Sequence, residues 1–217
     1  MKNPIDNYWK LKLENVKEAL ESNNFEVFIT DNSADALKLA LETIIPAANV
    51  KSISWGGSMT FIKTGLYEHL KDQKEFDILD IFDKSLSNEE KAQKRRQALL
   101  TDLFITGTNA LTEDGYLVNL DMIGNRIGAI TFGPTNVLIL IGRNKIVPDI
   151  ESAMDRIKNY VAPANAMRLD MKTPCVKTGA CSECSSKARI CNSWIITQKS
   201  FPKKRIKVVL INEDLGL

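Results

Sequence analysis

Apolar side chains recur every three or four residues in several stretches, and this spacing places them on one face of an α-helix. The opening stretch carries Trp9, Leu13 and Val16 in this pattern. Ser87 and Glu90 form a capping box at the start of another such stretch. The sequence thus predicts helices at residues 9–20, 31–44, 60–70, 87–100 and 148–161, the last of which Pro148 can begin.

Short apolar or alternating runs between these helices predict β-strands. The runs are residues 25–29, 52–55, 76–81, 102–106, 129–132, 137–141, 194–197 and 206–211. Residues 109–121 look like a hairpin that turns at 113–115. Because strands alternate with helices, we expect one α/β domain over residues 1–217, with a mainly parallel sheet flanked by helices. Ligands of such sheets bind beyond the carboxyl ends of the strands.

Two predicted strands end in glycine-containing turns. One turn is Gly56-Gly57-Ser58, and the other is Thr106-Gly107-Thr108-Asn109. Glycine lets the backbone approach a ligand closely, and the helix that follows offers unpaired N–H groups to an anion. Ser58 and Thr60 would add hydroxyl donors. A plain turn between strand and helix explains the same glycines, and the chain contains neither a P-loop nor a dinucleotide-binding glycine motif.

Charged and amide side chains gather at the ends of neighbouring predicted strands. They are Glu113, Asp121, Asn125, Arg126, Arg143, Asn144 and Lys145. This mixture suits a small anionic metabolite with a carboxylate or a phosphate, and Arg126 or Arg143 would clamp it. Structural ion pairs explain the same charges about as well.

Composition narrows the classes of function. The chain has 29 basic and 27 acidic residues, so its net charge of +2 provides no field for nucleic acid. Its longest apolar run, residues 137–141, is too short to span a membrane. The N-terminus leads into a charged amphipathic stretch instead of an apolar signal core, so we expect a cytoplasmic protein. Nothing near His69, the only histidine, suggests a hydrolase.

Four cysteines lie close together near the C-terminus. Cys181 and Cys184 form a C-x-x-C pair, with Cys175 before it and Cys191 after it. Disulfides are rare in the cytoplasm, and four thiolates suit tetrahedral zinc or an iron–sulfur cluster such as 4Fe-4S. The spacing in the cysteine-rich loop at residues 171–193 does not choose between these metals. Free thiols or a reversible disulfide are the alternatives.

Taken in order, these motifs resemble the lactate-utilisation (LUD) domain family. The blocks that carry the resemblance are residues 54–60, 106–110, 113–115, 124–126, 132–134, 142–145, 162–166 and 213–216. The resemblance implies a fold similar to the sugar-phosphate isomerase and CoA-transferase superfamily. It also implies a part in bacterial oxidation of L-lactate to pyruvate, together with iron–sulfur partner subunits that carry out electron transfer. The cysteine segment resembles that of a short branch of the family, and the ferredoxin-type motifs of larger relatives are absent from this sequence.

Three hypotheses follow for the function. The first is a subunit or accessory of an iron–sulfur-dependent system that oxidises L-lactate to pyruvate. The second is an enzyme or binding protein for a phosphorylated or CoA-linked metabolite, which the superfamily fold would support. The third is a non-catalytic docking module with structural zinc, since no nucleophile–base pair marks the chain as an enzyme. A homodimer is an assembly compatible with each of them.

Overall fold

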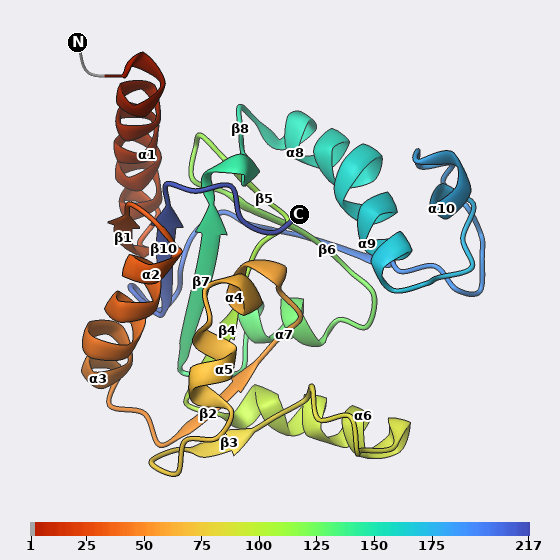
Figure 1. Ribbon diagram of the computed structural model, residues 1–217, viewed down its shortest axis with the longest axis horizontal. Coiled ribbons are helices and arrows are strands. Elements are labelled where there is room, and N and C mark those ends of the chain that lie inside the picture. The colour runs from red at the N-terminus through yellow and green to blue at the C-terminus, as the bar shows by residue number, and fades with distance from the viewer. Residues whose placement is uncertain (1–2) are drawn as a thin grey trace.

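The computed structural model describes residues 3–217 and shows an α/β fold (Figure 1). The α-helices are α1 Pro4–Ser22, α2 Ser33–Leu39, α3 Ile45–Ala48, α4 Met59–Lys63, α5 Leu66–Leu70, α6 Asn88–Gln97, α7 Asn125–Thr131, α8 Ile150–Arg156, α9 Ala162–Arg168 and α10 Cys175–Thr178. Two short π-helices, η1 Ala40–Ile44 and η4 Ile157–Val161, and two short 3₁₀ helices, η2 Ala98–Leu100 and η3 Arg143–Lys145, adjoin other elements. The strands are β1 Glu26–Thr30, β2 Ser52–Trp55, β3 Asp77–Leu79, β4 Leu103–Thr106, β5 Ala110–Thr112, β6 Leu117–Asp121, β7 Asn136–Gly142, β8 Ile146–Val147, β9 Ser193–Thr197 and β10 Ile206–Ile211.

A six-stranded parallel sheet forms the centre of the molecule, in the order β1-β10-β7-β4-β2-β3. Strands β7 and β10 are apolar along almost their whole length because both faces of the sheet are covered. Successive side chains of a strand point to opposite faces. Leu138 and Leu140 therefore pack under α2 to α5, while Ile139 and Ile141 pack with α1. The expected fold class, a mainly parallel sheet flanked by helices, is confirmed.

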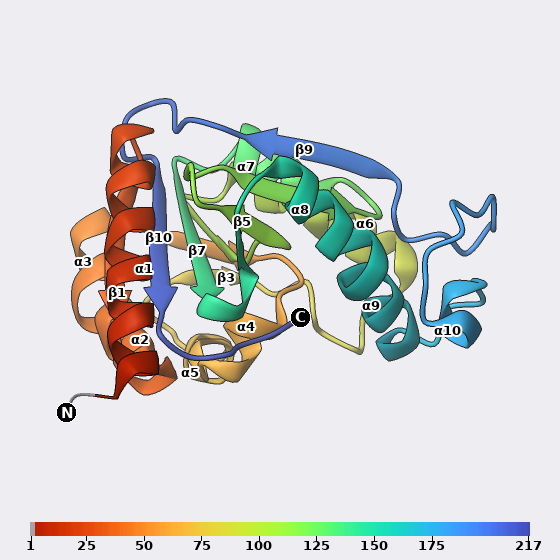
Figure 2. The same cartoon turned by 90° about the horizontal axis from the view of Figure 1, so that it is seen from above.

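A second, four-stranded sheet has the order β8-β5-β6-β9 and was not predicted (Figure 2). The predicted hairpin at 109–121 is present as β5 and β6, and it turns at Gly115, whose φ is +79°. A side chain at Gly115 would also meet the backbone of α1, 2.8 Å from the Leu20 nitrogen. Helix α8, the turn η4 and helix α9 pack against this sheet through Ala153, Ile157 and Val161.

Several predicted elements differ from the structure, and three of the differences have a clear physical reason. The helix predicted at 60–70 is divided into α4 and α5 at Gly65, where φ is +79° and the α-helical path ends. The apolar run at 129–132 lies on helix α7 and the residue after it, because Gly124 allows the chain to enter a helix directly from the end of β6. Helix α8 begins at Ile150, since the Asp149 carboxylate caps it by accepting from the Ser152 N–H.

Two π-turns interrupt long helices just before a proline. In η4, the N–H of Ala162 donates to the carbonyl of Ile157, five residues earlier, and Pro163 follows. In η1, the N–H of Ile45 donates to the carbonyl of Ala40, and Pro46 follows. Proline has no N–H, and its ring clashes with the carbonyl four residues before it. The wider turn lets each helix continue past its proline. Over residues 3–217, the helices are too short or too polar for any of them to cross a membrane.

Candidate functional site

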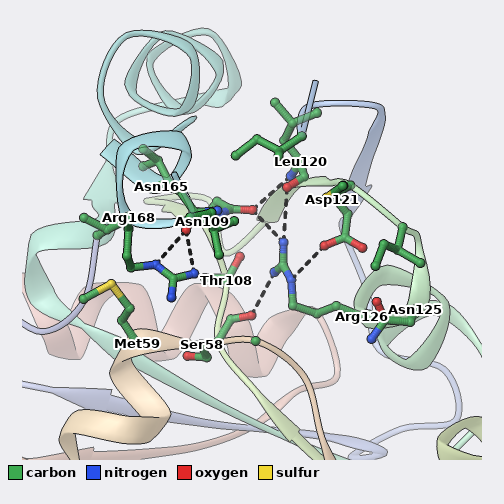
Figure 3. Close-up of a pocket in the computed structure, with 18 of the residues that line it drawn as sticks. Ser58, Met59, Thr108, Asn109, Leu120, Asp121, Asn125, Arg126, Asn165 and Arg168 are labelled. Carbon is green, nitrogen blue, oxygen red and sulfur yellow. Dashed lines mark hydrogen bonds and ion pairs between the residues drawn. The ribbon is translucent and has the colours of Figure 1, made fainter. Parts of the chain in front are cut away.

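A pocket of about 540 Å³ lies between the two sheets, beyond the carboxyl ends of β2 and β4 (Figure 3). The turn after β2, the loop between β4 and β5, the start of α7, and helix α9 contribute its walls. Four cationic side chains line it, Arg95, Arg126, Lys145 and Arg168, whereas Asp121 is the one acidic side chain among the described lining residues. The pocket is therefore electropositive, as an anion-binding site should be.

The two glycine-containing turns meet at the floor of this pocket. A Cβ added to Gly107 would lie 2.5 Å from the Ser58 Oγ and 3.3 Å from the Leu140 carbonyl oxygen, so any larger residue there would force the Ser58 side chain to move. Ser58 is the N-cap of α4, and its hydroxyl oxygen accepts from the Phe61 N–H at 3.2 Å. Gly57, in contrast, has open space where a Cβ would be. Close contact between the two turns thus explains Gly107.

Arg126 lies at the start of α7 and is 7% exposed. Its guanidinium pairs with the Asp121 carboxylate at 3.2 Å, and it donates to the Asn109 side-chain oxygen at 2.8 Å (Figure 3). Further bonds reach the Asn119 side-chain oxygen and the carbonyls of Gly107 and Leu120. Burial lowers the pKa of Arg126, and the Asp121 charge opposes that shift. The guanidinium is occupied by protein groups, so it shapes the pocket and contributes its charge.

Two more cations bind the same loop. The carbonyl of Thr108 accepts from the Lys145 amine at 3.1 Å, and the carbonyl of Asn109 accepts from Arg156 at 3.0 Å. With Arg126 on the carbonyl of Gly107, three consecutive carbonyls each receive a different cation. Across residues 3–217, ion pairing within this group is confined to Asp121 and Arg126. The loop at 107–109 therefore collects more positive charge than the protein neutralises.

Lys145 is 4% exposed and lies in η3 at the end of β7. Burial, with repulsion from Arg156 and Arg126, lowers the pKa of its amine to about 7. A hydrogen bond to a carbonyl does not stabilise an ammonium as a carboxylate would. About half of the amine is thus neutral at neutral pH, which is the condition in which a lysine can act as a nucleophile or base.

The C-terminal segment closes one side of the site. The carbonyl of Leu215 accepts from the Thr60 hydroxyl at 3.1 Å, and the N–H of Leu215 donates to the Asn144 side chain at 3.0 Å. A Cβ on Gly216 would lie 2.6 Å from the Thr60 hydroxyl oxygen and 3.2 Å from the Lys145 amine. Gly216, at φ +77°, therefore lets the backbone pass directly over the lysine.

Comparison with known protein families accounts for the glycine-containing and charged motifs that form this site. The LUD domain profile matches residues 13–211, which is most of the chain. The chain belongs to the LUD domain family. This membership relates it to lactate utilisation at the level of the family. No curated protein matches the chain.

Two solved structures are similar to this LUD protein, and the first of them shares its fold. A crystal structure of a DUF162 family protein from Deinococcus radiodurans has a TM-score of 0.50 and 11% identity, and covers 94% of this chain and 98% of its own. Ribose 5-phosphate isomerase from Plasmodium falciparum has a TM-score of 0.30 and 16% identity, and covers 52% of this chain and 54% of its own.

The structure brings together about half of the residues proposed for the site from sequence. Those that line the pocket are Gly57, Ser58, Gly107, Asn109, Asp121, Asn125, Arg126 and Lys145. The others, Gly56, Thr60, Thr106, Glu113, Arg143 and Asn144, lie beside or away from it. Glu113 pairs with Lys12 of α1, and Arg143 pairs with Asp214 at 2.9 Å while lying over the Trp9 ring. Arg143 therefore contacts the C-terminal segment and lies outside the group of residues that line the pocket.

Sequence reasoning missed the side chains that other elements bring to the pocket. Arg95 comes from α6, Asn165 and Arg168 from α9, and Ile190 from the cysteine-rich loop. The Arg168 guanidinium donates to Asn165 at 2.8 and 3.0 Å and is otherwise exposed (Figure 3). Asn165 belongs to the family block at 162–166, and that block was the one available signal for this wall.

The four cysteines lie outside the pocket and are free thiols. Cys175 begins α10, and the other three follow in irregular chain before β9. Arg189 donates to the carbonyls of Cys184 and Cys191 at 2.9 and 2.8 Å, and Glu183 pairs with Lys158 of η4. In the described part of the chain, no group of three or more Cys, His, Asp or Glu side chains is arranged to hold a metal. As they lie, the thiols do not fit a cluster or zinc, and a metal there stays a prediction.

The Arg126 network predicts a large loss of stability in an Arg126→Met variant. Asp121 and four other oxygens would each lose one donor, and breaking a buried pair of this kind costs about 3–5 kcal/mol. Chemical denaturation measures the change. Arg168→Met, which removes an exposed guanidinium bonded within its own helix, is the control and should change stability by less than about 0.5 kcal/mol. Equal, small effects of both substitutions would contradict the network.

Lys145 predicts an unusual pH dependence. The folded pKa of about 7 lies below the ordinary value of 10.5, so between these values the unfolded chain binds a proton that the folded chain lacks. The free energy of unfolding therefore rises with pH across this window by up to about 1.4 kcal/mol per pH unit. This gain is lost again as the pH falls to 7. Lys145→Met should lack this rise and gain most over the parent at pH 6. Parallel stability profiles of the two proteins between pH 6 and 10 would refute the assignment.

Proposed function

We propose that this LUD protein binds a small carboxylate metabolite, of the 2-hydroxy or 2-oxo acid class, in the pocket. The role proposed for it is that of a subunit or accessory of an iron–sulfur-dependent system that oxidises L-lactate to pyruvate in the cytoplasm. Family membership supports the pathway, and the pocket supports the chemical class of the ligand.

The single observation that carries this proposal is the uncompensated charge at the loop 107–109. Arg126, Lys145 and Arg156 each bind one of its carbonyls. The Asp121 carboxylate neutralises one of these three cations, Arg126. Buried cations without counter-ions are costly, and a bound carboxylate would lower that cost. Arg168, on the opposite wall, offers a guanidinium of the shape that binds a carboxylate with two parallel hydrogen bonds.

A second candidate rests on the size of the cavity. About 540 Å³ falls within the range of pockets that bind larger metabolites, and a three-carbon acid would leave much of it empty. A phosphorylated or CoA-linked metabolite would use the same cations and would also contact the apolar side chains of Met122, Ile123 and Leu169.

Ligand binding separates the two candidates. We expect L-lactate and pyruvate to raise the melting temperature in a concentration-dependent way, since a ligand that binds only the folded state stabilises it. Arg168→Met should abolish the increase. Arg96→Met is the matched control, because it removes the same group from an exposed position of α6 outside the pocket. Stabilisation by phosphate esters or CoA esters alone would favour the second candidate and overturn the first.

We further propose that the cysteine segment binds an iron–sulfur cluster or zinc and serves as the contact with other lactate-oxidation subunits. Much of the chain between Thr178 and Ile190 is exposed and lacks helix or strand. Gathering the thiols therefore requires movement of a loop with little buried surface and leaves the sheets in place.

Metal analysis of protein purified without oxygen tests this proposal. We expect iron with sulfide, or zinc, in the parent, and its loss in the Cys181→Ser, Cys184→Ser double variant. A Ser182→Ala, Ser185→Ala variant controls for changes in the same loop. Absence of metal after anaerobic reconstitution would show that the cysteines are plain thiols.

A further inference from the structure

We propose that the Lys145 amine is a nucleophile that forms a Schiff base with the carbonyl group of a 2-oxo acid bound in the pocket. This inference rests on the proposed function for the class of ligand, and it adds a covalent step at a named atom. From the sequence, Lys145 was expected to contribute only a positive charge to the site.

The position of the amine supports this role. It lines the pocket, and its hydrogen-bond acceptor is a backbone carbonyl, that of Thr108 at 3.1 Å. Among residues 3–217, no carboxylate lies within ion-pair distance of Lys145. A lysine that served the fold would be expected to pair with an acid, as Lys207 does with Glu26 in the neighbouring strand. Lys145 therefore carries a burial cost that no ion pair of the described residues offsets.

The charges around the amine favour its neutral, reactive form. Arg126 and Arg156 are the charged groups that face it, and both repel an ammonium. Its pKa of about 7 gives a neutral fraction at pH 7 roughly a thousand times that of an ordinary lysine. A desolvated lysine beside other cations is a known way to activate an amine.

A different cation, Arg168, would hold the carboxylate of the substrate. Arg168 enters the pocket from the side opposite Arg126, with Ser58 below (Figure 3). The Arg168 guanidinium has donors that are not used by Asn165, which accepts through one oxygen. An acid held by Arg168 can present its carbonyl carbon toward the loop at 107–109, where Lys145 lies.

The step balances without a further reactant. The neutral amine attacks the carbonyl carbon and forms a carbon–nitrogen bond. The carbonyl oxygen then leaves as water with the two protons of the amine, and the imine remains. The carbon is neither oxidised nor reduced in this step. Water must leave the pocket, which is open to solvent between the two sheets.

Trapping by borohydride tests the proposal on the whole chain. With pyruvate at pH 7, reduction should attach one pyruvate to Lys145, increasing the peptide mass by pyruvate minus one water plus two hydrogens. Labelling at Lys145 should exceed that at the exposed Lys172 by at least about a hundredfold. Lys145→Arg keeps a positive charge and Lys145→Met removes it. Neither variant should be labelled at residue 145.

Pyruvate binding measured on the same samples distinguishes the outcomes. Pyruvate that binds to the parent and yields no adduct at Lys145 would overturn the Schiff base and leave the proposed function intact. Labelling spread over surface lysines at similar rates would also overturn it. Failure of pyruvate to bind at all, with no adduct, would overturn both the Schiff base and the proposed function. An adduct at Lys145 that pyruvate-free samples lack would support both.

Discussion

Three cations, Arg126, Lys145 and Arg156, bind three consecutive carbonyls of the loop at 107–109, and the rest of the site depends on this arrangement. The loop leads from the parallel sheet into the second sheet. Because each cation comes from a different element, the three bonds fix the loop relative to α7, η3 and α8 together. The fold thereby keeps positive charge in a region of low dielectric, where interactions with an anion are strong.

The backbone of the site follows from a shortage of space. Gly107 lies against Ser58, and Gly216 lies against Thr60 and Lys145. Segments from four distant parts of the chain thus meet at one point, which explains why the family resemblance is carried by short blocks spread over the sequence. Each block alone has the composition of an ordinary turn. Their common function is to let backbone segments pack together without side chains between them.

Much of the main sheet could be predicted from the sequence, because β4, β7 and β10 are apolar runs bounded by polar turns. The loop residues at the carboxyl ends of β2 and β4 were predicted because ligands of parallel sheets bind beyond those strand ends. The wall from α9 could not be predicted, since the position of Arg168 depends on how α8, η4 and α9 pack on the second sheet. The lowered pKa of Lys145 could not be predicted either, because burial and the proximity of Arg156 arise only in the tertiary structure.

The π-turn η4 has a consequence for the direction in which α9 faces. Its hydrogen bond from Ala162 to Ile157 spans five residues, so the helix accommodates one residue more than a regular turn would. Successive residues of an α-helix are rotated by about 100° around the axis. Removing that extra residue would turn all of α9 by about this angle and direct Asn165 and Arg168 away from the pocket. The rotational phase of one helix, set by a single residue next to Pro163, thus decides whether the pocket has its outer cationic wall.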